Sequence, residues 1–147
     1  MATAVSTKTV WTIGHGDQDF DALAAALTRH RVQTIVDVRS EPYSKRAPDF
    51  TKAALEEFAA SAGFGYRWMG SKLGGKPLAT AEVFATGIDE VVGLSRSSQV
   101  VLLCAEANPV HCHRDVVLAP ALVGRGFEVV HILADGAAMP YQEHLAI

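Results

Sequence analysis

Short apolar runs alternate with amphipathic stretches along the whole chain. The apolar runs are rich in β-branched residues and predict five strands, at 9–13, 33–38, 64–68, 99–103 and 127–133. The run at 99–103 is unbroken, which is typical of a strand covered on both faces. Strands that alternate with amphipathic helices predict a three-layer, Rossmann-like α/β fold, with a mostly parallel sheet of about five strands and helices on both faces.

Capping signals mark the ends of the helices expected between these strands. Asp17 is a candidate N-cap for a first helix that carries apolar residues at helical spacing. Phe50, Thr51 and Leu55 fit the N′, N-cap and N4 positions of a hydrophobic staple, and Gly63 would close that second helix. A third helix is expected just before the strand at 99–103.

Length and composition narrow the class of protein. At 147 residues, with 49% hydrophobic and 20% charged residues, the chain predicts one domain spanning 1–147. A net charge of -3 provides no global basic field, so nucleic acid is unlikely as the main partner. No apolar segment is long enough for a membrane span, and we expect a soluble, cytoplasmic protein. In that compartment two cysteines are expected as free thiols, metal ligands or redox groups.

Polar residues follow three of the predicted strands. In a parallel sheet the carboxyl ends of the strands meet at one edge, where ligands usually bind. The residues expected there are His15 after the first strand, Asp37, Arg39 and Ser40 at the end of the second, and Cys104 and Glu106 after the fourth. The sequence therefore predicts a binding site at this edge of the sheet.

The stretch VVLLCAEANPVHCHRD, residues 100–115, carries the densest chemistry. Asn108 and Pro109 fit the N-cap and first position of a helix, which would place Cys112 and His113 in or just past its first turn. The unpaired N–H groups there lower a thiol pKa and attract anions. Arg114 adds a planar donor group suited to a phosphate or carboxylate. Further along, a proline at 120 is expected to kink the helix.

Four segments of the chain, in order, resemble the signatures of the domain-of-unknown-function 488 family: TIGHGD, IVDVRSEPYSK, KLGG and LLCAEANPVHCHRD. The resemblance covers residues 11 to about 132. It implies a three-layer α/β fold and a polar cluster of His15, Asp37, Arg39, Glu106, Cys112, His113 and Arg114, but no particular reaction. The chain departs from the family at Gly16, where members often have serine, and Ala47 and Pro48 lie in a variable stretch.

These residues favour an enzyme of hydrolase or transferase type that binds a small anionic or nucleotide-like substrate. In this hypothesis the catalytic groups are Cys112, His113, Glu106 and Asp37. The substrate-binding groups are His15, Arg39, Arg114 and Ser40. Asp37 and Arg39 have the spacing of an ion pair on one face of a strand end, which is also a common purely structural arrangement.

Other interpretations of the same residues stay open. Cys104 alone is equally well explained as a small buried core residue. Cys104, Cys112 and His113 offer ligands that zinc or iron accepts, although their spacing matches no known structural site. A non-catalytic module that binds a metal, a nucleotide or nucleic acid is the alternative function. Redox switching between the two thiols requires them to lie within disulfide distance.

The segment GSKLGGKP, residues 70–77, fits the spacing of a phosphate-binding P-loop as far as its lysine. Pro77 then replaces the serine or threonine that would hold magnesium. We therefore expect a glycine-rich loop beside the site and no nucleoside triphosphate cradle.

Overall fold

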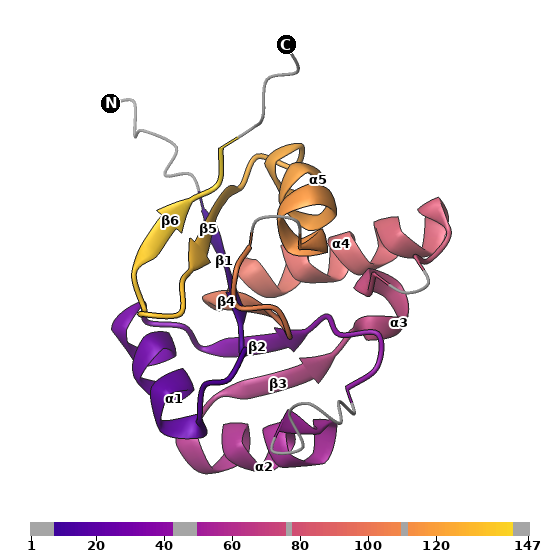
Figure 1. The fold of residues 1–147 in the computed structure, drawn as a ribbon. Coiled ribbons are helices and arrows are strands. Elements are labelled where there is room, and N and C mark those ends of the chain that lie inside the picture. Colours follow the sequence, from indigo (N-terminus) through magenta and orange to yellow (C-terminus); the bar gives the residue numbers. More distant parts are fainter. Residues whose placement is uncertain (1–7, 43–49, 76–77, 110–111, 143–147) are drawn as a thin grey trace.

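The fold is described from a computed structural model that covers residues 8–42, 50–75, 78–109 and 112–142. A six-stranded sheet lies between two layers of helices (Figure 1). The strand order is β3-β2-β4-β1-β5-β6, and only β6 pairs antiparallel with its neighbour. The strands are β1 (Thr9–Gly14), β2 (Thr34–Asp37), β3 (Gly65–Trp68), β4 (Val100–Cys104), β5 (Glu128–Ile132) and β6 (Ala138–Pro140). The predicted mostly parallel α/β fold is confirmed, and the short β6 adds a strand that its three residues could not reveal by periodicity.

Helices cover both faces of the sheet. They are α1 (Phe20–Arg29), α2 (Lys52–Ala62), α3 (Gly70–Leu73), α4 (Ala81–Ser95), the π-helical turn η2 (Arg114–Leu118) and α5 (Ala119–Val123). Helices α1 and α2 lie on one face, and α3, α4 and α5 lie on the other (Figure 1). Each layer has its own core: Ile13, Leu27 and Leu55 belong to the first, and Leu102, Val91 and Leu118 to the second. No helix in the described part of the chain is long and apolar enough to cross a membrane.

The helix caps agree with the sequence in one case and differ in another. Thr51 caps α2, since its hydroxyl accepts a hydrogen bond from the N–H of Ala54, and Gly63 ends the helix in the left-handed conformation as predicted. The predicted N-cap at Asp17 is wrong. Asp19 caps α1 instead, because Asp17 lies inside a turn in which the Gln18 N–H donates to the His15 carbonyl.

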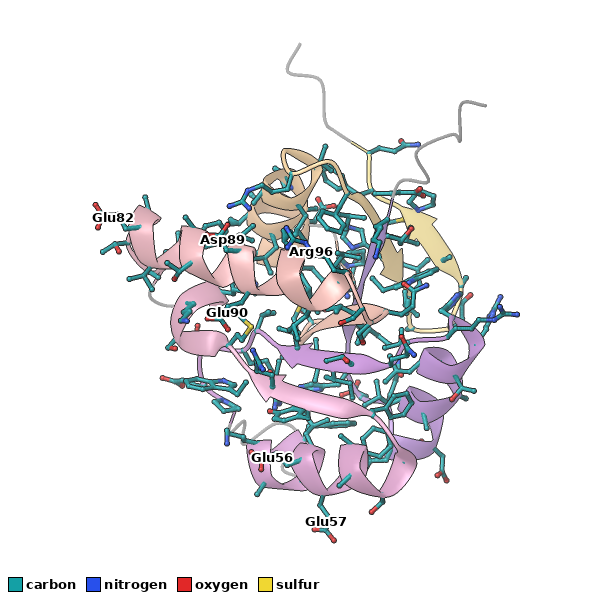
Figure 2. All side chains as sticks on the ribbon, turned by 180° about the vertical axis from the view of Figure 1, so that it is seen from behind. Glu56, Glu57, Glu82, Asp89, Glu90 and Arg96 are labelled. Atoms are coloured by element: carbon teal, nitrogen blue, oxygen red, sulfur yellow. The ribbon has the colours of Figure 1, made fainter. Side chains whose placement is uncertain are left out.

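Charged side chains lie on the outer faces of the helices, and some join neighbouring elements. Figure 2 shows Glu57 on α2 directed away from the sheet. On α4, Glu90 accepts hydrogen bonds from Lys72 of α3 and from Arg67 of β3, the latter at 3.5 Å. These contacts hold α3 beside α4, next to the carboxyl edge of the sheet.

The segment at 70–77 is not simply the loop expected from its glycines, because residues 70–73 form the helical turn α3. Leu73 is fully buried and anchors this turn in the core. Gly70 passes so close to the second strand's connection that an added Cβ would lie 1.9 Å from the carbonyl oxygen of Arg39. Pro77 lies outside the described residues, as do Ala47 and Pro48.

Candidate functional site

A cleft of about 580 Å³ opens at the carboxyl edge of the sheet. It is lined by His15, Arg39, Ser40, Glu41, Gly75, Cys104, Ala105, Glu106, Cys112 and His113. These residues come from the end of β4, from the segments that follow β1, β2, β4 and α3, and from the two residues before η2. The structure therefore brings together six of the eight sequence-predicted catalytic and binding residues, and places Asp37 and Arg114 behind the cleft wall.

A close backbone approach forms one side of this cleft. The N–H groups of His15 and Gly16 donate to the carbonyls of Cys104 and Ala105, both at 2.9 Å, so the loops after β1 and β4 run side by side. Gly14 permits this contact, because an added Cβ would lie only 1.7 Å from the carbonyl oxygen of Glu106. The backbone therefore holds the His15 and Glu106 segments in fixed relative positions.

Asp37 forms a two-pronged ion pair with Arg39. Its carboxylate accepts hydrogen bonds from Nε and Nη2 of Arg39, each at 2.8 Å, and from the Arg39 backbone N–H at 3.1 Å. The Tyr66 hydroxyl donates to the same carboxylate at 2.5 Å, and burial together with this bond raises the pKa of Tyr66. Asp37 is fully buried, and its contacts hold the Arg39 guanidinium at the cleft. Asp37 therefore acts as a positioning residue for Arg39.

His15 stacks on Phe50, with ring centroids 4.5 Å apart. Its Nε2 lies 3.4 Å from Nη1 of Arg39, which can only donate, and so Nε2 is an acceptor. Nδ1 then carries the proton and donates to the Gly16 carbonyl at 3.0 Å. Burial lowers the pKa of His15, which favours this neutral form next to a fixed positive charge.

The two cysteines meet at the floor of the cleft. Their Sγ atoms lie 3.6 Å apart, and both thiols are free. The pKa of Cys112 is lowered to about 4, chiefly by a hydrogen bond from the Cys104 thiol and further by the His113 side chain, the Arg114 N–H and the Arg114 charge. Burial, together with this donation, raises the pKa of Cys104. These opposite shifts favour the thiolate form of Cys112, with Cys104 as the donor of the hydrogen bond between them.

The helix beside Cys112 begins later than its sequence indicates. Asn108 and Pro109 are not helical, and in the described part of this segment helical structure begins at His113, followed by η2 and α5, so the predicted start at Asn108 is wrong. The Asn108 N–H instead donates to Oε1 of Glu106 at 3.2 Å. Cys112 lies just before this segment, and its carbonyl accepts hydrogen bonds from the N–H groups of Asp115 at 2.9 Å and Val116 at 3.1 Å. A thiolate at a helix start is stabilised by the N–H groups there.

His113 is oriented by the end of α3. Its Nε2 lies 3.1 Å from the carbonyl oxygen of Leu73, which can only accept, so Nε2 carries a proton. Gly75 leaves room for the ring, since an added Cβ would lie 3.3 Å from Cγ of His113. A hydrogen bond that lowers the pKa of Cys112 must be donated to the sulfur, so the ring stabilises the thiolate through an N–H at its remaining nitrogen, Nδ1.

Arg114 lies beneath the cleft, where it is fully buried. Its guanidinium donates to the Ala107 carbonyl at 2.7 Å and to the Thr12 hydroxyl at 3.3 Å. None of the ion pairs within the described ranges includes Arg114, so its charge acts on the nearby Cys112 thiolate. Arg114 thus supports the 105–109 loop and the thiolate from behind.

A buried hydrogen-bonded chain continues from Arg114 and was not foreseen from the sequence. Thr12 lies 2.5 Å from Nδ1 of His131, whose Nε2 lies 3.0 Å from Oδ1 of Asp115. Since the carboxylate only accepts, Nε2 carries the proton and Thr12 donates to Nδ1. The available signal was polar residues within apolar strands, Thr12 in β1 and His131 in β5.

Cys104, Cys112 and His113 also form the group predicted as possible metal ligands. Their ligand atoms all lie within 4.8 Å of one another. Two Zn–S bonds of about 2.3 Å at a tetrahedral angle would separate the sulfurs by roughly 3.8 Å. The observed 3.6 Å is close to that value, so the donor set and geometry fit such an ion.

The comparison with protein families matches the model for "Domain of unknown function DUF488" at residues 19–81 and 75–120, more than half of the chain. The chain belongs to the DUF488 family. The match includes Asp37, Arg39 and the segment from Cys104 to Arg114, and the resemblance seen in the sequence motifs is thereby confirmed. The comparisons with curated proteins and with solved structures gave no match. Membership of the DUF488 family assigns no substrate, so the residues of the cleft are the only guide to the chemistry of this protein.

Proposed function

We propose that this DUF488 protein is an enzyme of hydrolase or transferase type, acting on a small anionic or nucleotide-like substrate with Cys112 as its nucleophile. The observation that carries the proposal is a cysteine, Cys112, at the floor of a cleft whose wall also presents a fixed guanidinium, that of Arg39, and the lowered pKa of Cys112 favours its thiolate form. A nucleophile and an anion-binding cation facing one cleft are the two requirements of acyl or phosphoryl transfer by a thiol.

The roles follow from the contacts. Arg39, positioned by Asp37, binds the anionic oxygens of the substrate, and Ser40 and His15 line the same space. Cys112 attacks the electrophilic carbon or phosphorus, forming a covalent intermediate and releasing the leaving group. His113, with Nδ1 available to the sulfur, holds or moves the proton there. Glu106 is exposed at the rim and serves as the acid or base towards the leaving group or an incoming water.

Arg114 contributes to substrate binding through the loop it supports. Its bond to the Ala107 carbonyl holds the loop that follows Cys104 and carries Glu106, and its charge favours the Cys112 thiolate. We assign Arg114 this indirect role in place of direct contact with the substrate, since its guanidinium does not line the cleft. We place the reaction in a reducing, cytoplasmic environment, in which both thiols stay free.

Alkylation with an anionic and a neutral reagent of similar size tests the proposal. Cys112 is treated with iodoacetate and with iodoacetamide at neutral pH, and the ratio of the two rates is compared with that of N-acetylcysteine. We expect a several-fold higher ratio for the protein, lowered by inorganic phosphate and by Arg39→Gln, because the positive charge of the guanidinium attracts the carboxylate. A misfolded variant changes both rates, whereas loss of anion binding changes the iodoacetate rate alone. A ratio no higher than that of the free thiol contradicts the proposal.

Turnover is measured with para-nitrophenyl phosphate and para-nitrophenyl acetate, and Cys112→Ser is expected to abolish it. Binding of phosphate without turnover of any ester would instead favour the non-catalytic module.

A metal-binding module is the second candidate, favoured by the compact group of Cys104, Cys112 and His113. Zinc or iron would be held by the two sulfurs and a histidine nitrogen, with the Leu73 carbonyl orienting the ring. Elemental analysis of untagged protein, purified without oxygen, decides between the candidates. Stoichiometric metal that is lost in Cys112→Ser supports this second function, and its absence from both proteins contradicts it.

A further inference from the structure

Cys104 donates a hydrogen bond to the nucleophile, but its own sulfur takes part in no step of the proposed reaction. The chain contains only two cysteines, and their Sγ atoms are 3.6 Å apart. Cys104 ends β4, and Cys112 directly precedes the helical segment. A disulfide requires a separation of about 2.05 Å, so the sulfurs need to approach by roughly 1.5 Å.

Exposure distinguishes the two thiols. Cys112 is 9% exposed and Cys104 is 3% exposed, although both line the cleft. A reagent that enters the cleft therefore meets Cys112 before Cys104. Because Cys112 itself is largely buried, only a small reagent can reach it. The burial of Cys104 leaves Cys112 as its only possible disulfide partner, because no other cysteine exists in the chain and a second molecule cannot reach it. The geometry thus assigns one sulfur to attack and the other to close the bond.

We propose that a small hydroperoxide oxidises Cys112 and that Cys104 resolves the product as an intramolecular disulfide. This modification uses the same nucleophilic sulfur as the proposed function but does not depend on that function's substrate. Formation of the disulfide removes the thiolate, so it reversibly switches the site off.

The atoms and electrons balance over two steps. The Cys112 sulfur attacks one oxygen of the hydroperoxide: an S–O bond forms, the O–O bond breaks, and the leaving oxygen takes up a proton as alcohol or water. Sulfur loses two electrons, which the peroxide gains. The Cys104 thiol then attacks the sulfenic sulfur: the S–S bond forms, the S–O bond breaks, and the hydroxide leaves with the Cys104 proton as water. A dithiol reductant restores both thiols by thiol–disulfide exchange.

The chain offers a direct readout. Trypsin cleavage after Arg96 and Arg114 releases residues 97–114 as one peptide that contains both cysteines, and cleavage after Glu106 separates them. The full-length protein, stripped of metal with a chelator and checked by elemental analysis, is treated with one equivalent of hydrogen peroxide, and free thiols are blocked with N-ethylmaleimide. We expect the tryptic peptide to lose two hydrogens and to remain unblocked. Its halves stay joined after cleavage at Glu106 until dithiothreitol is added.

Variants assign the order of events. In Cys104→Ser, the sulfenic acid at Cys112 persists and is trapped by dimedone, whereas the wild-type protein yields little adduct. In Cys112→Ser, Cys104 stays reduced at the same dose. The measurement on the wild-type protein needs neither variant to fold.

The proposal is overturned if peroxide leaves both thiols reduced, if Cys112 proceeds to sulfinic acid while Cys104 stays free, or if the disulfide joins two molecules. Its failure can be distinguished from failure of the proposed function. A normal disulfide with an ordinary iodoacetate ratio refutes only the anion-directed enzyme, and the reverse result refutes only the redox pair.

Discussion

Replacing Asp37 by Asn tests whether the buried ion pair holds the cleft together. In the native protein the carboxylate accepts two side-chain bonds from Arg39 at 2.8 Å, one from its backbone N–H and one from Tyr66, while the two ion-pair side chains are 5% and 0% exposed. An Asn amide has the same shape, but its NH₂ group would face donors of Arg39 or Tyr66. The guanidinium, whose side chain is 5% exposed, would also be left without its counter-ion.

Removing one partner of a buried ion pair costs about 3–5 kcal/mol, because the remaining charge stays desolvated. With an m-value of about 2 kcal/mol per molar urea, the unfolding midpoint should fall by roughly 2 M. The measurement is urea unfolding followed by circular dichroism, with the m-value checked in each variant. Tyr66→Phe removes a hydrogen bond and leaves no charge unpaired, so its expected cost is smaller, about 1.5–3 kcal/mol.

Glu56→Gln serves as the matched control for loss of a carboxylate. Glu56 pairs with Lys52 on the outside of α2, where the two side chains are 48% and 36% exposed. Solvent screens such pairs, and the expected cost is below about 0.5 kcal/mol. If Asp37→Asn lowers the free energy of unfolding by less than about 1 kcal/mol, or by no more than Glu56→Gln does, the buried ion pair does not hold the cleft together.

Two further predictions concern the backbone and the thiolate. Gly14→Ala should destabilise the protein by at least about 1–3 kcal/mol, because the added Cβ would collide with the Glu106 carbonyl. Gly93→Ala on α4 should stabilise it by about 0.5–1 kcal/mol, because the added Cβ meets no atom within 4 Å. Equal midpoints of the two variants in thermal unfolding would contradict this. Iodoacetamide should alkylate Cys112 at a nearly constant rate from pH 9 down to pH 6, since a pKa lowered to about 4 keeps the thiolate present until the pH falls towards that value. A tenfold loss per pH unit below pH 8 would show an ordinary thiol, and Cys104→Ala should shift the profile to higher pH by removing the strongest hydrogen bond to the sulfur.

Much of the fold followed from local pattern. Five of the six strands, the cap at Thr51 and the end of α2 at Gly63 are consequences of side-chain spacing and turn chemistry within a few residues. Errors arose where a distant contact overrides the local signal. Asn108 has the chemistry of an N-cap, but its N–H is engaged by Glu106 and the helical structure begins five residues later. Asp19 caps α1 in place of Asp17 because Asp17 lies in the turn that follows β1.

The sequence alone determined which chemical groups are present and that the ends of parallel strands would gather them at one edge. Only the tertiary structure decided their roles, because these depend on distance and burial between segments far apart in the chain. It paired Asp37 with Arg39 and Tyr66, and it buried the Arg114 guanidinium beneath the cleft. It also brought two thiols eight residues apart to 3.6 Å. Periodicity reports the face on which a side chain lies, whereas proton sharing, ion pairing and access to solvent require the atoms to meet.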